Sequence, residues 1–437
     1  MPVAGHRAIA RDLAIGARVV VLVTGANGFI GAAVVDALRA AGYRVIEATR
    51  HAARAADTVQ ADFTRDFDAA VWLPRLIGVD AVINAVGILR EDGVQTFDAL
   101  HVRAPRALFA ACADAGVSRV IQVSALGADA DAVSAYHISK RKADDFLAAL
   151  PVSSVMVQPS LVYGPGGESA RLFDTLATLP LIPLPGDGLQ RIQPIHVDDL
   201  VACIVALLGR DRWRTGRVAL VGAEPMTLRG YLETLGRALG RSHIRFISIP
   251  RNWVRAAASF GKIAPGALLD NETLAMLERG NIADVADTER LLGAKPRAAA
   301  HFIPRRVAPS ARRHAQLNWL LPVLRLAVAT MWIVTGIVSL AVFPIADSFA
   351  LLARTGITGN LATAALIGAA VLDIALGVAT LAAPSRQLWW CQIVLILAYT
   401  LIISVWLPEF WAHPYGPVLK NLPILAALLL LASLEES

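Results

Sequence analysis

Residues 19–31 read VVVLVTGANGFIG, and no other stretch constrains the fold of this chain as strongly. The first five residues are apolar and four are β-branched, which predicts a buried strand of a parallel sheet. Three glycines follow, at the start of a helix expected over 29–41. The first permits a tight turn, the second lets the backbone approach a pyrophosphate, and the third lets the helix pack close to the strand.

Such a turn binds a dinucleotide, because the free N–H groups and the positive end of the helix dipole face the phosphates. The alternative is a turn that is merely rich in glycine, without the strand and helix on either side that the binding motif requires. The residues expected at the cofactor here are Gly25, Asn27, Gly28, Phe29, Ile30 and Gly31.

Strand-like and helix-like segments alternate over about the first 160 residues. Strands are expected at 19–24, 43–49, 57–61, 80–84, 119–124 and 152–158. Helices are expected at 29–41, 66–77, 97–115 and 133–149. This alternation predicts an α/β fold with a doubly wound parallel sheet, whose ligands lie at the carboxyl ends of the strands.

The end of the second strand bears on the choice of cofactor. An NAD-selective site usually carries an acid here to bind the ribose 2′-hydroxyl. Glu47 is two positions too early for that role. Arg50, together with Arg54, is placed to meet a 2′-phosphate instead, so the sequence favours NADP over NAD. The alternative is an ordinary solvated arginine.

Other strand ends supply further candidate contacts. At the third, Asp62 is expected to accept from an adenine amino group, with Phe63 packing beside it. The fourth ends in small residues that let a cofactor lie against the backbone, and the sixth ends beside the nicotinamide position. Helix capping or turn chemistry would explain Asp62 and the residues after the fourth strand equally well. The expected contacts at the fourth and sixth ends are Asn84, Val86, Gly87 and Pro159.

Ser124 ends the fifth strand, and Tyr136 and Lys140 follow on one face of the next helix. A free tyrosine has a pKa of about 10, too high for a base near neutrality. A fixed ammonium favours the phenolate, so Lys140 is expected to lower the pKa of Tyr136 and to bind the nicotinamide ribose. With Ser124 holding a substrate carbonyl, the three residues predict a proton relay for hydride transfer. Tyrosine and lysine at this spacing also occur by chance.

Three features resemble the short-chain dehydrogenase/reductase superfamily. They are TGANGFIG at 24–31, the spacing from Ser124 through Tyr136 to Lys140, and QPSLVYGPGG at 158–167. Within this superfamily the chain is similar to the atypical extended members, a group that includes the nucleotide-binding accessory subunit of respiratory complex I.

The resemblance covers about residues 18–300 and implies a Rossmann domain, a nicotinamide cofactor and the same catalytic trio. His101 departs from it, because the superfamily often has an asparagine there that takes part in a water relay. The lobe that receives the substrate is expected mainly within 160–300, and nothing in it names the substrate. The acidic pair Asp198-Asp199 is expected to start a helix.

Composition sets the outer boundaries. Residues 1–18 hold no apolar segment of the kind found in a secretory signal. The nucleotide-binding domain with its substrate lobe is expected to fill 19–303. Residues 304–318 carry four arginines and two prolines with no apolar period, which predicts a basic linker. Near an anionic membrane surface each such arginine contributes about 1 kcal/mol.

The remaining residues, 319–437, predict an all-α domain of four transmembrane helices. A spanning helix needs about 20 apolar residues, a length that three of the runs reach and the last nearly reaches. The arginines before the first run place its start in the cytoplasm, and four spans return the C-terminus there. A buried helix bundle of a soluble protein is the alternative. The apolar runs lie at about 321–342, 361–383, 388–408 and 417–434.

The sequences LDIALG at 372–377 and HPYGPVLKNLPIL at 413–425 resemble the DoxX-like membrane family. Asp373 lies near the middle of its apolar run, so it is expected to face the interior of the bundle. Arg325 is its candidate partner.

Together these observations predict an NADP-dependent oxidoreductase tethered to the inner (plasma) membrane, with the nucleotide domain and both termini in the cytoplasm. The expected partners are the lipid bilayer and an unidentified substrate with a carbonyl, lipid-like or quinone-linked. The alternatives are a non-catalytic NADP(H)-binding scaffold or sensor of a membrane complex, and a sugar-nucleotide epimerase or dehydratase. Neither a metal site nor a nucleic-acid partner is expected, because the cysteines are scattered and the basic residues form no stripe with aromatic ones.

Overall fold

The structure is a computed structural model that describes residues 19–50, 57–209, 215–254 and 271–435. The segment 1–18 and Arg54 lie outside these residues. The chain divides into two compact units, Met1–Ala315 and Gln316–Ser437, and each is described by itself.

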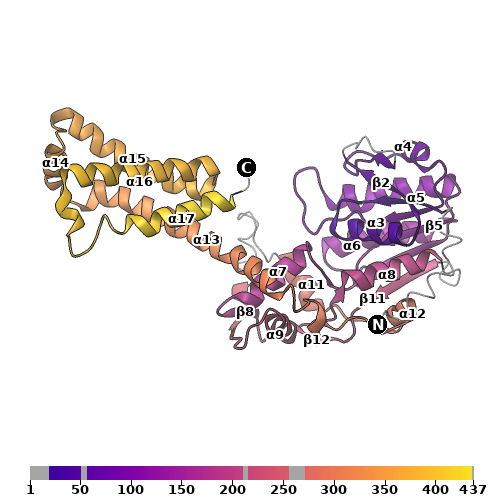
Figure 1. Ribbon diagram of the computed structural model, residues 1–437. Coiled ribbons are helices and arrows are strands. Elements are labelled where there is room, and N and C mark those ends of the chain that lie inside the picture. Colours follow the sequence, from indigo (N-terminus) through magenta and orange to yellow (C-terminus); the bar gives the residue numbers. More distant parts are fainter. Residues whose placement is uncertain (1–18, 51–56, 210–214, 255–270, 436–437) are drawn as a thin grey trace. The chain divides into compact units, whose positions relative to one another are not determined.

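A seven-stranded parallel sheet forms the centre of the first unit, which confirms the predicted fold (Figure 1). The strands lie in the order β11-β6-β5-β4-β1-β2-β3. The chain runs outward from β1 through β2 and β3 and then crosses to β4 on the other side of β1. Ligands of such sheets bind at this switch point. The strands are β1 (Val20–Thr24), β2 (Arg44–Thr49), β3 (Thr58–Gln60), β4 (Ala81–Asn84), β5 (Arg119–Val123), β6 (Ser154–Pro159) and β11 (Thr215–Leu220).

Helices cover both faces of the sheet and make three layers (Figure 1). On one face α3, α8 and α12 pack against strand residues such as Val21 and Ile83. On the other face α4, α5 and α6 pack against the alternate residues, such as Leu22 and Val82. The strands are apolar throughout because both of their faces are buried. The helices are α3 (Phe29–Ala40), α4 (Ala69–Trp72), α5 (Ala104–Asp114), α6 (Ala135–Ala148), α8 (Val197–Leu208) and α12 (Ala286–Leu292).

The helix expected over 97–115 is divided. It begins as a π-helix, Asp98–Arg103, and becomes α-helical only at Ala104. Pro105 follows in the first turn of α5 and has no N–H to donate to a preceding carbonyl, which suits a change of helix type at this point. Turns of π-helix are frequent at functional sites, and this one carries His101.

Two other helix predictions need correction. The helix expected over 66–77 is the short α4 followed by a 3₁₀-helix, Leu73–Leu76, which has a proline at its second position. The helix α8 begins at Val197 rather than at the acidic pair. His196 caps it, because its Nδ1 accepts a hydrogen bond from the N–H of Asp198 at 3.2 Å.

A smaller lobe follows the sheet. Three pairs of short strands, β7 with β10, β8 with β13 and β9 with β12, stand beside three helices. Its core includes Tyr163, Tyr231 and Phe302. The elements are β7 (Val162–Tyr163), α7 (Glu168–Thr178), β8 (Ile182–Pro185), β9 (Arg191–Ile192), β10 (Ile195–His196), β12 (Met226–Thr227), α9 (Leu228–Ala238), β13 (Phe246–Ile249) and α11 (Asn271–Arg279).

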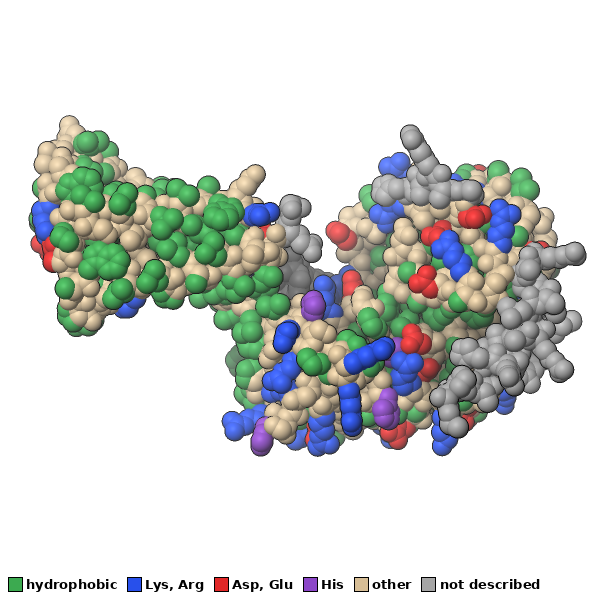
Figure 2. Space-filling view, viewed as in Figure 1, with side chains coloured by type: hydrophobic (Ala, Val, Ile, Leu, Met, Phe, Trp, Pro, Cys, Tyr) green, Lys and Arg blue, Asp and Glu red, His purple; other side chains and the backbone are tan. Residues whose placement is uncertain are grey.

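The second unit is all α-helical, and three of its helices are long and apolar enough to cross a membrane. The fourth apolar helix has 14 residues, about 21 Å, which is shorter than a hydrocarbon core of about 30 Å. Figure 2 shows apolar side chains over the visible face of this unit, with charged ones near its ends. The helices are α13 (Ala308–Ile337), α14 (Ile345–Arg354), α15 (Gly359–Ala382), α16 (Arg386–Trp406) and α17 (Asn421–Leu434).

The basic segment 304–318, expected to be a linker, is mostly helical. Helix α13 begins at Ala308 and continues through the arginines into the first apolar run. Pro309 lies in the first turn, where its missing N–H costs no hydrogen bond. Arginine and alanine are good helix formers, so nothing else in the segment stops the helix.

Arg325 pairs with Glu435 rather than with Asp373, which corrects the expected pairing. The Arg325 guanidinium lies 2.7 Å from the Glu435 carboxylate, and the Trp389 indole donates to the same carboxylate at 3.1 Å. The end of α17 therefore lies beside α13 and the start of α16 within this bundle. Asp373 is 5% exposed, as expected for a carboxyl group that faces the interior.

Glycines bring α13 and α15 into close contact. A Cβ added at Gly377 would lie 2.5 Å from Cγ1 of Ile333 and 2.8 Å from the carbonyl oxygen of Ala329. A Cβ added at Gly336 would lie 2.5 Å from the carbonyl oxygen of Ala370. Small residues at such contacts let helix backbones approach in a membrane, where no hydrophobic effect drives helices together.

We expect G377A to destabilise the second unit by about 1–3 kcal/mol, because the added methyl group overpacks the contact with α13. The control is G368A in the same helix, where the added Cβ meets nothing within 4 Å and the gain in helix propensity is the same. Thermal unfolding of the detergent-solubilised chain measures both. Equal melting temperatures for the two variants would contradict the packing described.

Candidate active site

The glycine turn after β1 leaves no room for side chains. Gly25 has a φ of +70°, and a Cβ there would lie 2.9 Å from the carbonyl carbon and oxygen of Ala85. A Cβ on Gly31 would lie 2.0 Å from the carbonyl oxygen of Gly25. The backbone of α3 therefore rests directly on the turn, and the turn rests on the residues that follow β4.

The N-terminus of α3 is open. Its capping residue is Gly28, which offers no side chain to the first turn, and Asn27 and Gly28 are exposed. Phe29 turns towards the lobe, where Cβ atoms added at Gly164 and Gly167 would lie 3.1 and 2.9 Å from its ring. Ile30 packs at the edge of the core on the same face of the sheet. The free N–H groups of this turn, rather than these two side chains, are suited to meet a phosphate.

The residues expected around the adenosine differ in their exposure and in what they contact. Arg50 is exposed at the end of β2 and donates to Oε1 of Gln95 at 3.2 Å. Burial raises the pKa of Asp62, but the hydroxyl and N–H of Thr64 both donate to its carboxylate, so the pKa is lowered overall. Asp62 therefore stabilises its own turn. Phe63 is 7% exposed and packs edge-on against Trp72 in the core.

Asn84 belongs to a buried polar row across three central strands. Its Oδ1 accepts from the hydroxyl of Thr24 at 2.5 Å, and its amide donates to Oε1 of Gln122 at 2.6 Å. The same Oδ1 lies 3.3 Å from the N–H of Val86, which turns the chain after β4. At the end of β6, the carbonyl of Pro159 accepts from Leu126. Through these hydrogen bonds Asn84 supports the backbone at the switch point.

Lys140 is buried where β4 and β5 end. Its ammonium group donates to the carbonyl oxygens of Val86 at 3.2 Å and Val123 at 3.1 Å. A Cβ on Gly87 would lie 2.9 Å from Nζ, so glycine there leaves room for the ammonium. Burial lowers the pKa of Lys140 to about 8, while Asp144 opposes the change. Two of its three N–H groups are engaged, and the third remains for a ligand.

The pKa of Tyr136 does not move as the sequence suggests. Burial raises it to about 12, and the negative charge of Asp144 adds to the increase. Lys140 points to backbone carbonyls, which explains why its ammonium does not lower the pKa of Tyr136 here. The predicted activation of Tyr136 as a base is therefore corrected: this environment keeps the phenol protonated.

His101 holds its neighbours in place instead of relaying protons. Its Nε2 accepts from the N–H of Ile88 at 3.0 Å, and its Nδ1 lies 2.9 Å from Oγ of Ser139. Because the Ser139 hydroxyl donates to the carbonyl of Tyr136, Nδ1 carries the proton that Ser139 accepts. Burial, followed by the charge of Lys140, lowers the pKa of His101 to about 2, so the ring stays neutral.

Two residues at the site were missed from the sequence. Asp144 is fully buried, and its Oδ2 accepts from the Ser124 hydroxyl at 2.5 Å. It follows Lys140 by four residues, so its place on the same helix face was readable from the spacing. Arg279 of α11 donates to the carbonyl of Gly127 and to the carboxylate of Asp129, at 2.7 and 2.6 Å. No sequence signal links these distant positions.

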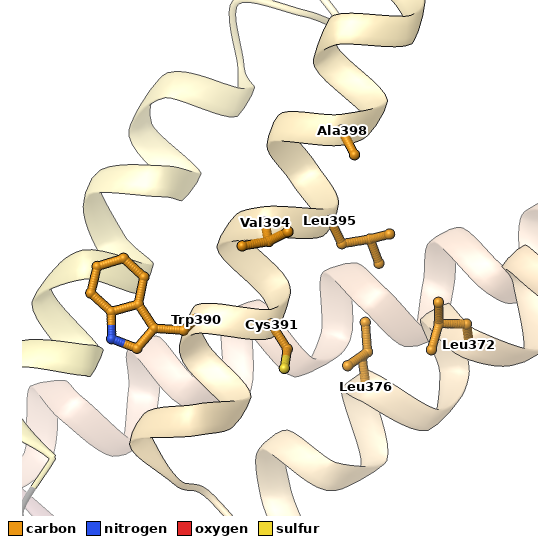
Figure 3. A pocket seen from close by; sticks show the side chains of 7 residues that line it. All are labelled: Leu372, Leu376, Trp390, Cys391, Val394, Leu395 and Ala398. Carbon is orange, nitrogen blue, oxygen red and sulfur yellow. The ribbon is translucent and has the colours of Figure 1, made fainter.

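The second unit has a groove of about 440 Å³ between α15 and α16. Figure 3 shows its lining side chains, which come from these two helices and are mostly apolar. Within the described residues, no group of three or more His, Cys, Asp or Glu side chains could hold a metal ion. The chemistry-bearing side chains described above thus belong to the first unit. The lining residues are Leu372, Leu376, Trp390, Cys391, Val394, Leu395 and Ala398.

The sequence model of the NAD dependent epimerase/dehydratase family matches residues 21–222, and that of the DoxX-like family matches residues 329–429. Ceramide reductase from Caulobacter vibrioides is 32% identical over 233 residues, which cover 51% of this chain and 69% of that protein. The mitochondrial NADH dehydrogenase [ubiquinone] 1 alpha subcomplex subunit 9 of Arabidopsis thaliana is 28% identical over 260 residues, 55% of this chain and 63% of that protein.

Among solved structures, a nucleoside-diphosphate-sugar epimerase from Staphylococcus aureus superposes with a TM-score of 0.53 at 17% identity. The match covers 65% of this chain and 99% of that one, and at this identity it shows the fold alone.

We expect G31A to weaken NADPH binding about tenfold or more, because strain of about 1–3 kcal/mol moves α3 away from the turn. The control is G209A at the end of α8, where an added Cβ meets nothing within 4 Å. Nucleotide fluorescence titration of the purified full chain gives both dissociation constants. An unchanged constant for G31A would show that the turn does not set nucleotide binding.

Proposed function

Since the chain belongs to the NAD-dependent epimerase/dehydratase family and continues into a DoxX-like domain, we propose that it is a membrane-tethered oxidoreductase that reduces a carbonyl group with NADPH. The observation that carries the proposal is the position of Lys140, buried where β4 and β5 end and one helical turn from Tyr136. The nicotinamide cofactor supplies the hydride in this chemistry.

Tyr136 acts as the acid in this reaction. A pKa raised to about 12 keeps the phenol protonated at neutral pH, ready to donate a proton to the carbonyl oxygen as hydride arrives. The Lys140 ammonium is directed at the carbonyls of Val86 and Val123, and its third N–H is free to bind the ribose. Ser124 holds the carbonyl. The protonated phenol is the form from which reduction of a carbonyl starts.

The proposed cofactor is NADP rather than NAD. Arg50 is exposed at the carboxyl end of β2, with its side chain extended to Gln95. A guanidinium at this position meets a 2′-phosphate with charge-assisted hydrogen bonds. The Asp62 carboxylate is engaged with the N–H and hydroxyl of Thr64.

The proposed substrate is lipid-like. A catalytic unit joined to apolar helices meets substrates that reside in the membrane, and the name ceramide reductase of one relative describes a reaction on a lipid. We place the nucleotide-binding unit and both termini on the cytoplasmic side of an inner membrane. The Arg325–Glu435 pair supports this topology, because it brings the C-terminal end of α17 beside the basic start of the first span.

A second candidate is a non-catalytic nucleotide-binding subunit of a membrane complex. The likeness to a complex I subunit favours it. An assay of the purified chain with carbonyl compounds and quinones distinguishes the two candidates. Oxidation of bound NADPH favours the reductase, and its absence favours the non-catalytic subunit.

We expect Y136F to abolish carbonyl reduction, with a loss of at least about 100-fold in kcat, because it removes the proton donor. NADPH affinity should change little. The control is Y231F, which removes a buried lobe hydroxyl without a hydrogen-bond partner in the described structure. Stopped assays with a panel of aliphatic ketones, quinones and acylated amino ketones measure turnover. Equal rates for Y136F and the unaltered chain would exclude Tyr136 as the acid.

We expect R50A to weaken NADPH binding roughly 10- to 100-fold and to leave NADH binding unchanged, because only the 2′-phosphate loses its partner. The control is R44A at the opposite end of the same strand, where the arginine pairs with Asp57 on the surface. Calorimetric titration with both nucleotides gives the ratio of affinities. A parallel loss for NADH and NADPH would point to a fold defect instead of 2′-phosphate recognition.

A further inference from the structure

Beneath the catalytic serine lies a carboxyl group to which the reaction proposed above assigns no role. Asp144 is fully buried in α6, with Oδ2 accepting from the Ser124 hydroxyl at 2.5 Å. Its other oxygen, Oδ1, is buried and has no hydrogen-bond partner in the described part of the chain. A buried carboxylate with a bare oxygen is costly, whereas a neutral carboxylic acid in the same place is less so.

The charged groups around Asp144 come from two elements. On its own helix, Lys140 lies one turn before it and Asp145 is its neighbour, and from β11 Arg217 approaches. Burial raises the pKa of Asp144 most, and Asp145 adds to the increase. Ser124, Lys140 and Arg217 lower it. The balance raises the pKa to about 7, so both forms of the carboxyl are populated near neutrality.

The form of the carboxyl decides what the serine can do. A hydroxyl has a single proton to donate. When Asp144 is ionised, the Ser124 hydroxyl donates its proton in a hydrogen bond to Oδ2 and offers only lone pairs to a substrate. When Asp144 is protonated, its own O–H can donate to Ser124, and the Ser124 proton is then free for a substrate carbonyl oxygen.

We propose that Asp144 is a positioning residue whose protonation state sets the direction of the Ser124 hydroxyl, so that only the neutral acid prepares the site for a carbonyl. The inference rests on the proposed function for its kinetic consequence. Tyr136 reinforces it, because the charge of ionised Asp144 raises the pKa of Tyr136 and makes it a poorer proton donor. Reduction therefore slows as the pH rises through the pKa of Asp144.

The test measures the contribution of Ser124 at two pH values. S124A is compared with the unaltered chain, and S124A/D144N with D144N, at about pH 6 and about pH 8.5. With Asp144 present, we expect S124A to slow kcat/KM about tenfold or more at the lower pH and much less at the higher one. With D144N the factor should be equal at both, because an amide N–H can donate to Ser124 at any pH. Ionisation of Lys140 affects both members of each pair and largely cancels.

The matched control is D145N. Asp145 is the next residue, carries the same charge and pairs on the surface with Arg141 and Arg217. The pH-dependent factor should persist in D145N. If the Ser124 factor is the same at both pH values in the unaltered chain, or shrinks equally with D144N, the proposal is overturned.

A second measurement needs no substrate. Infrared difference spectra between the full chain and D144N, with NADPH bound, should show a protonated carboxyl band at about pH 6 that disappears by about pH 8.5. The same comparison with D145N should show no such buried band. A carboxyl ionised throughout this range overturns the proposal even if no carbonyl compound is ever reduced. Absence of turnover with the band present instead overturns the proposed function alone.

Discussion

The contact between the third glycine and the turn before it fixes the rest of the nucleotide-binding unit. With no Cβ on Gly31, α3 sits on the carbonyl of Gly25, and Gly25 in turn touches the backbone of Ala85 after β4. Three segments thereby meet at one point of backbone contact. The free N–H groups of α3 are aimed across the switch point, and the chain after β4 is held close enough for its Val86 carbonyl to receive Lys140.

How much of this was predictable depends on whether the cause is local. The strands were predictable, because buried parallel strands are apolar throughout and the glycine turn marks where the first one ends. The division of the helix over 97–115 was not predicted, because the spacing of apolar residues alone does not separate a π-helix from an α-helix. Pro105 in the first turn of α5 is the sequence signal for the change. The helical conformation of the basic segment before the first span was not predicted, although its second proline occupies a permitted first-turn position.

The partners of charged groups were the least predictable part. Lys140 was assigned to Tyr136 from their spacing, whereas its ammonium donates to two backbone carbonyls that no sequence pattern marks. The sequence offers Arg325 as the candidate partner of Asp373, but Arg325 pairs with Glu435 from the far end of the chain. Asp144 follows Lys140 by four residues, so its place on the same helix face could be predicted from the spacing. What the sequence could not give was its hydrogen bond to Ser124, which depends on how α6 lies against β5.

The balance of buried charge at the site bears on the proposed reduction. An alcohol dehydrogenase needs a phenolate, and a phenolate needs positive charge beside it without a competing anion. Here burial disfavours the phenolate, and the charge of Asp144 disfavours it further when that carboxyl is ionised, so Tyr136 holds its proton. Reduction of a carbonyl starts from that protonated state and creates the phenolate only as the proton leaves.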